Sequence, residues 1–338
     1  MKRFLKVIVL LFLFCSGSVF AKEEIKIFFY NINSGFMSHV QNTMQKMAKQ
    51  RGYKIKSYDA KSDAKKQYEQ LKKHISIGDM VVISVSDEEY LPKMIQEASD
   101  HDAKVVLFGS SPTANIASSY DKAWYVGFEM FDSAHKQYSM IKKYLNEFPE
   151  YNRNKNGSLD VVFLQGREKE YSTHVRTQVI LENLERYGVK INPLSYNFDN
   201  YSFSEAYEDL KNQINKYGIE NIEMVIANND SMALGAIKAL NEKKYNMPYS
   251  LFSGHNYIPV FGIDGITEAL KSVDSGMLTG TAIADYSALS RVIMLIFESS
   301  SDEDFEKIVW YKVDNRSIFI PYRAFSKIKV YNAQSLTK

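Results

Sequence analysis

The sequence alternates short apolar runs with amphipathic segments, and this order constrains the fold more than any other feature. Runs typical of buried β-strands begin near residues 25, 53, 80, 104, 159, 222, 259 and 278, and most are followed by a segment with helical spacing. Strands that alternate with helices favour a parallel sheet covered by helices on both faces. This alternation is interrupted by a predicted helix over 133–147 and a polar loop over 151–158, and it resumes after the loop. The 338 residues therefore predict two α/β units of similar size with no long linker.

The first 21 residues have the organisation of a secretory signal peptide. Three basic residues precede an apolar run from 7 to 14, and small residues lead into a polar segment at 22–24. We expect export to the periplasm and cleavage after Ala21, which removes the single cysteine and changes the formal net charge from +2 to −1. A lipid anchor on Cys15 is the alternative, although Phe14 is larger than the small residue expected before it. The near-neutral charge argues against nucleic-acid binding.

Polar side chains follow the predicted strands at their carboxyl ends, which is where open α/β sheets bind ligands. They are Asn31, Asn33 and Ser34, then Glu170, Ser172 and Arg176, and finally Asn229, Asp264 and Asp285, with Gly109 at a further strand end. Carboxylates accept hydrogen bonds from hydroxyls, a guanidinium donates to them, and an amide does both. The pattern therefore predicts a small polyhydroxylated ligand bound at a rim shared by both units.

The stretch VIANNDSMALGAIKAL, residues 225–240, joins one of these strands to its helix. We expect Asp230 to cap the amino terminus of the helix and Asn229 to face the ligand. Asn228 then satisfies local backbone groups. Two other candidates have structural alternatives, because Phe36 also suits the core and Arg176 also suits a solvated helix face.

Residues 226–233, IANNDSMA, resemble the signature of the periplasmic sugar-binding proteins of the ribose/galactose type, the type I periplasmic binding proteins. Residues 119–127, 259–273 and 314–322 are similar to the galactose/glucose-binding members, and the resemblance covers nearly all of 25–330. It implies two Rossmann-like lobes, each a parallel sheet with helices on both faces, joined by a three-strand hinge. The N-terminal lobe would comprise 24–127 and 286–315, and the C-terminal lobe 128–285 and 316–338. It further implies a monomer that closes on a sugar and then engages an ABC permease.

The resemblance also implies roles for five side chains. Phe36 and Tyr201 would lie against the two faces of a sugar ring, with Tyr201 where the hexose binders have tryptophan. Arg176, Asn229 and Asp264 would bind the hydroxyl groups of the sugar.

Five other positions depart from the hexose-binding pattern. Ser34 and Ser172 stand in place of aspartates, Gly109 and Ala284 in place of asparagines, and Glu170 in place of a histidine. Each lost hydrogen-bond partner costs about 1–3 kcal/mol, so we expect a ligand other than glucose or galactose. We also expect Glu170 to face Arg176 and to form an internal pair with it.

A second motif, NRNKNGSLD at 152–160, has the spacing of a calcium loop. Its candidate ligands are Asn152, Asn154, Asn156, the Ser158 carbonyl and Asp160, and Glu223 matches the distant glutamate that completes such a loop in the hexose binders. Three amides replace carboxylates here, and Arg153 and Lys155 add positive charge. Both a bound Ca²⁺ and a metal-free turn remain open, and no other cofactor is expected.

The leading functional hypothesis is a periplasmic solute-binding protein of an ABC transporter. The alternative is a sensor that signals to a membrane chemoreceptor without transport. A repressor with this fold would need a DNA-binding module before the first strand, where the signal peptide stands. The chain has no nucleotide-binding glycine loop, nucleophile elbow or zinc spacing, so we predict no enzymatic activity.

Overall fold

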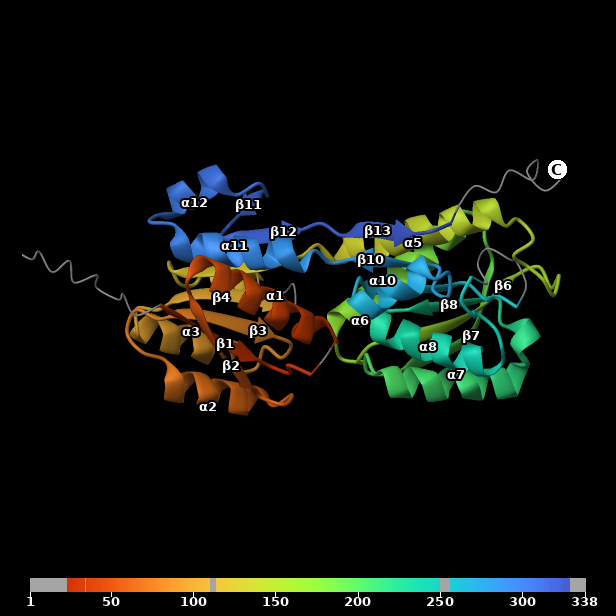
Figure 1. Ribbon diagram of the computed structural model, residues 1–338, viewed down its shortest axis with the longest axis horizontal. Coiled ribbons are helices and arrows are strands. Elements are labelled where there is room, and N and C mark those ends of the chain that lie inside the picture. The colour runs from red at the N-terminus through yellow and green to blue at the C-terminus, as the bar shows by residue number, and fades with distance from the viewer. Residues whose placement is uncertain (1–22, 34, 110–113, 250–255, 329–338) are drawn as a thin grey trace, which may run out of the picture.

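The two halves of the chain form two lobes that lie end to end (Figure 1). The structure, a computed structural model, describes residues 23–33, 35–109, 114–249 and 256–328. Each lobe is built on its own sheet, with seven strands in the first and six in the second. We call them the N-lobe and the C-lobe. The predicted signal peptide, Cys15 and Ser34 lie outside the described residues.

The N-lobe sheet has the strand order β11-β12-β5-β4-β3-β1-β2. Its strands are β1 (Glu24–Phe29), β2 (Lys54–Asp59), β3 (Met80–Val85), β4 (Lys104–Gly109), β5 (Ala123–Phe128), β11 (Val313–Asp314) and β12 (Ser317–Ile320). All neighbours are parallel except the edge pair β11/β12. The helices are α1 (Gly35–Arg51), α2 (Ala64–His74), α3 (Leu91–Asp100), α4 (Ala114–Ala117), α11 (Tyr286–Glu298) and α12 (Asp302–Ile308). Helices α1 and α11 pack together on one face, and α2 and α3 pack together on the other.

The C-lobe sheet has the order β13-β10-β9-β8-β6-β7. Its strands are β6 (Leu159–Gln165), β7 (Ile191–Phe198), β8 (Met224–Ala227), β9 (Val260–Asp264), β10 (Gly280–Ile283) and β13 (Arg323–Ser326). Only the pair β10/β13 is antiparallel. The helices are α5 (Met130–Glu147), α6 (Tyr171–Arg186), α7 (Phe203–Tyr217), α8 (Asp230–Glu242) and α10 (Thr267–Asp274), with the short 3₁₀ turn η2 (Ile219–Asn221). Helices α5 and α6 cover one face, and α7, α8 and α10 cover the other.

The predicted fold class is confirmed, with an antiparallel pair at one edge of each sheet. The domain boundaries need one correction, because β12 pairs in parallel with β5 in the N-lobe sheet. The last crossover therefore follows Ile320 instead of lying near residue 316. Helix α12 had no clear sequence signal, since it is only seven residues long and buries a single side chain, Phe305.

The chain crosses between the lobes three times, after β5, after β10 and after β12 (Figure 1). The first and third crossovers are bonded to each other. The Glu129 amide donates to the Ile320 carbonyl at 2.9 Å, and the Tyr322 amide donates to Asp132 Oδ2 at 2.8 Å. These bonds hold the two segments side by side where the lobes meet.

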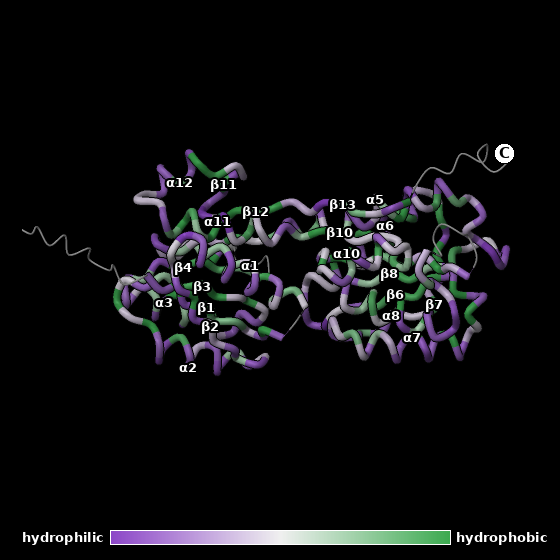
Figure 2. Tube along the Cα trace, viewed as in Figure 1, coloured by the Kyte–Doolittle hydropathy of each residue, from purple (hydrophilic) through white to green (hydrophobic). Residues whose placement is uncertain are grey.

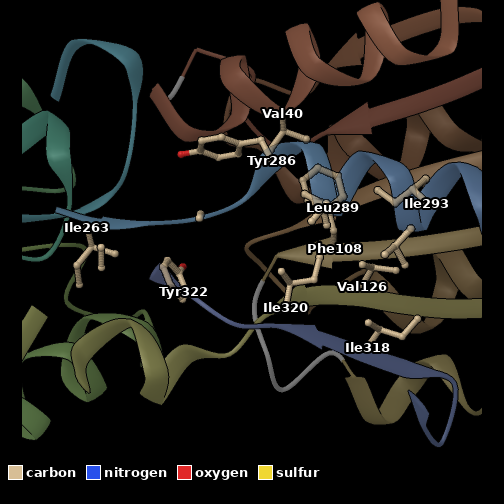
Figure 3. Packing of buried hydrophobic residues seen from close by; sticks show 14 of the residues in the cluster. Val40, Phe108, Val126, Ile263, Tyr286, Leu289, Ile293, Ile318, Ile320 and Tyr322 are labelled. Atoms are coloured by element: carbon tan, nitrogen blue, oxygen red, sulfur yellow. The ribbon is translucent and has the colours of Figure 1, made fainter. Parts of the chain in front are cut away.

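Hydrophobic residues concentrate on the strands, and hydrophilic residues face outward on the helices (Figure 2). The largest hydrophobic cluster runs through both lobes. Figure 3 shows Tyr286 and Tyr322 between Ile263 of the C-lobe and Phe108 and Leu289 of the N-lobe. Within the described ranges, no helix combines the length and the apolar composition that a membrane span needs.

The junction between β7 and α7 contains a buried acid with little compensation. Asp199 is 3% exposed, and its Oδ2 has no hydrogen-bond partner in the described part of the chain. Burial, together with the charges of Asp209 and Glu205, raises the pKa of Asp199 to about 8. Asn200 and Tyr201, which follow directly, both have positive φ angles, 53° and 60°. A buried acid that the fold keeps protonated up to about pH 8 thus lies beside the turn that carries Tyr201.

We expect Asp199→Asn to flatten the dependence of stability on pH. The folded protein keeps a proton on Asp199 up to about pH 8, whereas the unfolded chain releases it near 3.8. The wild-type protein therefore loses this contribution as pH rises from about 4 to 8, and the variant should gain roughly 2–4 kcal/mol over wild type at pH 8 but little at pH 4. Urea unfolding at several pH values measures this, with exposed Glu208→Gln as the control. Parallel pH profiles for Asp199→Asn and wild type would contradict the expectation.

Candidate ligand-binding cleft

A cavity of about 660 Å³ lies between the two lobes, and side chains from both of them line it. The structure brings nine of the twelve candidate residues together around this cavity, namely Asn31, Phe36, Gly109, Glu170, Ser172, Arg176, Tyr201, Asn229 and Asp264. Asn33 and Asp285 do not line it, Asp285 instead capping α11, and Ser34 is outside the described residues. The nine residues meet because parallel strands place their carboxyl ends at one edge of each sheet, and the two edges face each other. Ala284, the further departure from the hexose pattern, is buried on the second crossover.

The amino terminus of α8 differs from the sequence prediction. Asn229, not Asp230, is the N-cap, and its Oδ1 accepts a hydrogen bond from the Met232 amide at 3.0 Å. Asp230 is the first helical residue and is fully buried, so the prediction that it caps the helix was wrong. Its Oδ1 accepts from Thr281 Oγ1 at 2.6 Å and its Oδ2 from the Ile266 amide at 3.0 Å.

The reason for this inward position is the space that β9 leaves beside Asp230. Gly262 has no side chain, and a Cβ there would lie 2.2 Å from Asp230 Oδ1. The carboxylate fills that space and joins the ends of β8, β9 and β10. Burial and the neighbouring charge of Asp264 raise the pKa of Asp230 well above its usual range.

Asp264 is the last residue of β9, and its φ angle of +122° lies in a region that residues other than glycine rarely adopt. Such a conformation costs about 1–3 kcal/mol and persists only where the surroundings impose it. Here the Asp264 carbonyl accepts hydrogen bonds from the Ala284 amide at 3.0 Å and from the Tyr286 hydroxyl at 2.8 Å. Burial raises the pKa of Asp264 to about 7, and the charge of Arg176 opposes that increase.

Arg176, a residue of α6, extends its side chain along the cavity floor. Its Nη1 donates to the Asn228 carbonyl at 2.7 Å, and its Nη2 lies 3.5 Å from the Tyr322 hydroxyl. Burial disfavours the charged form, but Tyr322, Tyr201 and Asp264 raise the pKa of Arg176 above its ordinary value. The guanidinium is therefore charged, and Asp264 is the acid whose negative charge favours that form.

Tyr201 is held by its own lobe. Its hydroxyl forms hydrogen bonds of 2.9 Å with Ser172 Oγ and with Thr173 Oγ1. Arg167 lies over the ring, 5.7 Å from the centroid, and its Nη1 pairs with Glu170 Oε1 at 2.7 Å. The prediction that Glu170 pairs with Arg176 is therefore wrong. Glu170 pairs instead with Arg167, which lies three residues before it in the same loop.

Aromatic side chains form the back of the cleft, and sequence reasoning found only Phe36 among them. Phe36 meets Phe128 edge to face at 6.0 Å and Tyr286 at 5.4 Å, while Phe128 lies 5.4 Å from Tyr322. Phe128 and Tyr322 also line the cavity. Phe128 is the last residue of β5 and Tyr322 stands on the crossover after β12, so their position at the ends of N-lobe strands was the available signal.

Gly109, at the end of β4, is required by the backbone. Its φ angle is +123°, and a Cβ there would lie 2.2 Å from the Val85 carbonyl oxygen. Its own carbonyl accepts a hydrogen bond from the Tyr125 hydroxyl at 2.9 Å. A side chain at this strand end is therefore excluded by close contact between β3 and β4.

The calcium-like loop closes on its own hydrogen bonds. Asp160 accepts from the side-chain amides of Asn154, Asn156 and Asn192 at 2.6–2.8 Å. Glu223 accepts from the backbone amides of Arg153, Asn154 and Asp160 at 2.5–3.3 Å. Both carboxylates thus receive N–H donors, and among the described candidate ligands of this loop only the side chain of Asn152 has a buried oxygen without a hydrogen-bond partner. This donor set does not fit Ca²⁺, which needs several free oxygen ligands.

Comparison with known proteins identifies the family of the chain. Residues 25–297 match the family described as the periplasmic binding protein domain. The D-galactose/methyl-galactoside binding periplasmic protein of Haemophilus influenzae is 27% identical over 315 residues, which is 92% of each chain. The resemblance to periplasmic sugar-binding proteins of the ribose/galactose type is therefore confirmed.

Solved structures share the two-lobed fold. An ABC transporter solute-binding protein from Bacillus halodurans C-125 with bound myo-inositol has a TM-score of 0.68 at 20% identity, covering 90% of this chain and 94% of that one. A periplasmic solute-binding protein from Actinobacillus succinogenes 130z with bound D-allose has a TM-score of 0.69 at 16% identity, covering 90% and 98%. Both similarities establish the type I two-lobe fold.

We expect Gly109→Asn, which restores the amide of the hexose pattern, to destabilise the N-lobe. The positive φ and the contact with Val85 should together cost roughly 2–4 kcal/mol. Urea unfolding measures the loss, and Gly109→Ala should lose a similar amount because the added Cβ is responsible. If Gly109→Asn unfolded like wild type, the steric explanation for this glycine would be untenable.

Proposed function

Because the chain belongs to the family of periplasmic binding protein domains, we propose that it binds an uncharged monosaccharide or a similar polyhydroxylated solute between its lobes. Relatives that bind galactosides, inositol or allose support this class of ligand. Closure of the lobes about the three crossovers would present the loaded protein to an ABC permease. The chain then acts as a binding protein and not as an enzyme.

The compensation of charge inside the cleft is the observation that carries this proposal. Arg167 pairs with Glu170, and the other charged residues that line the cavity carry both signs, Lys169 and Arg176 against Asp87, Glu88 and Asp264. No strong net charge is left for an ionic ligand. The remaining capacity of Arg176, Asn229 and Asp264 to donate and accept hydrogen bonds suits neutral hydroxyl groups.

Location and partners extend the same proposal. Membership of a periplasmic family supports export, with cleavage after Ala21 as the sequence predicts. We propose that the mature protein is a monomer, and that an inner-membrane permease recognises its closed form. A chemoreceptor that recognises the same form is the alternative partner.

A screen of hexoses, pentoses, polyols and nucleosides by thermal shift tests the proposed ligand class. A ligand at a hundredfold excess over its Kd should stabilise the protein by about 2.7 kcal/mol. Asp264→Asn should weaken binding of that ligand roughly tenfold or more, because a charged hydrogen-bond acceptor is lost. The control is Asp274→Asn, because Asp274 is an exposed residue at the end of α10 that does not line the cleft. A melting temperature unmoved by the whole panel would refute a sugar-binding role.

We also propose that the loop at 152–160 is stable without metal, because amide donors occupy its two carboxylates. Excess Ca²⁺ and excess EGTA should then give the same melting temperature for the wild-type protein. The triple variant Asn152→Asp, Asn154→Asp, Asn156→Asp should melt lower in EGTA and recover in Ca²⁺, because unpaired carboxylates repel each other. Calcium-dependent stabilisation of the wild type would show that the amide loop does bind the ion.

A further inference from the structure

The two walls of the cleft differ in chemistry. The C-lobe wall presents side chains that form directed hydrogen bonds, chiefly Ser172, Arg176, Asn229 and Asp264. The inner N-lobe wall presents hydrocarbon instead. It is formed by Phe36, Met37, Phe108, Val126, Phe128 and Leu289. We call these six residues the apolar wall.

Five polar residues of the N-lobe also line the cavity, in the segments that follow β1 and β3: Tyr30, Asn31, Ser86, Asp87 and Glu88. Asn31 donates to Ser62 Oγ at 2.9 Å and accepts from the Asn33 amide at 2.9 Å. Asp87 accepts from the Glu89 amide at 3.0 Å. Asn31 and Asp87 are thus partly engaged by other groups of the N-lobe.

The apolar wall is also fixed in shape. Its aromatic rings contact each other and the crossover tyrosines at 5.4–6.0 Å. The two glycines beside it cannot be replaced by polar residues, because a Cβ on Gly109 would meet the Val85 carbonyl and one on Gly127 the Tyr125 hydroxyl, at 2.2 and 2.1 Å. Figure 3 shows Phe108, Val126 and Leu289 packed together in the N-lobe core. The wall cannot rearrange to offer hydrogen bonds.

This asymmetry selects among polyhydroxylated ligands. A hydroxyl pressed against the apolar wall gives up its bonds to water and gains none, whereas a hydrogen or methyl group there buries apolar surface. Resting on the proposed function, we propose that the natural ligand turns a deoxygenated face, such as a deoxy or methyl position, to the apolar wall and its hydroxyl groups to the C-lobe. The ligand class is thus a deoxy sugar or a related partly deoxygenated polyol.

Matched sugars test this inference by calorimetry on the full-length mature protein. D-glucose and D-galactose are compared with their 2-deoxy and 6-deoxy derivatives, and myo-inositol is the fully hydroxylated reference. At least one deoxy derivative should bind roughly tenfold to a hundredfold more tightly than its parent, the discrimination that one hydroxyl in an apolar pocket produces.

Two methionines on α1 provide a matched pair of variants. Met37 lines the cleft, whereas Met47, also half-buried on α1, is not among the lining residues. Met37→Gln adds an amide to the apolar wall and should bring the ratio of deoxy to parent affinity close to one. Met47→Gln should keep the wild-type ratio. Met37→Leu keeps hydrocarbon at the wall and should also keep it.

The outcomes separate this inference from the proposed function. If the parents or myo-inositol bind as tightly as every deoxy derivative, the protein is a sugar-binding protein but the deoxygenated face is refuted. An unchanged ratio in Met37→Gln would likewise refute the role of the wall. If neither these compounds nor any member of the wider sugar and polyol panel binds, the proposed function and this inference both fail.

Discussion

The buried carboxylate of Asp230 holds the floor of the cleft together. It accepts hydrogen bonds from Thr281 on β10 and from the Ile266 amide before α10, while Asp230 itself begins the helix after β8. One side chain thereby joins three consecutive strand ends. Asn229 precedes it in the chain, and Asp264 stands at the end of the strand between. The positions of these two candidate ligand-binding groups therefore depend on an interaction that never reaches the ligand.

At this floor the C-lobe places a charged guanidinium close to acids whose pKa values are raised. The Arg176 guanidinium is buried and charged, and the acids nearest to it hold their protons more tightly than usual. Charged groups in a dry pocket form strong hydrogen bonds, but they exclude ions that would leave a charge uncompensated. Such a floor suits neutral hydroxyl groups. The strained backbone of Asp264, fixed by Tyr286 and Ala284, keeps the acceptor in place before a ligand arrives.

The departures from the hexose-binding pattern have different physical origins. Gly109 follows from the backbone, because β3 and β4 approach too closely for a side chain. Ser172 forms a hydrogen bond that fixes the Tyr201 hydroxyl, and Glu170 is paired within its own loop. The calcium-like loop shows the same trend, since amide donors take up the oxygens of Asp160 and Glu223. The type I fold is thus combined with polar side chains that are bonded within the protein at several of these positions.

The sequence by itself determined the order of strands and helices, the parallel sheets and the gathering of polar residues at strand ends. Those features follow from hydrophobic periods of two residues in strands and 3.6 residues in helices. Each period can be recognised within a single element, without knowing which other elements pack against it. Only the tertiary structure decided that Asp230 points inward, that Glu170 pairs with Arg167, that β12 belongs to the N-lobe and that Tyr322 reaches the cleft. Each of these depends on which elements lie side by side, and on the space a residue such as Gly262 leaves for a distant side chain. A linear pattern does not carry that information. Some interacting residues, such as Asp230 and Thr281, are far apart in the chain. In other cases two residues nearby in the chain, such as Arg167 and Arg176 for Glu170, are both available as partners.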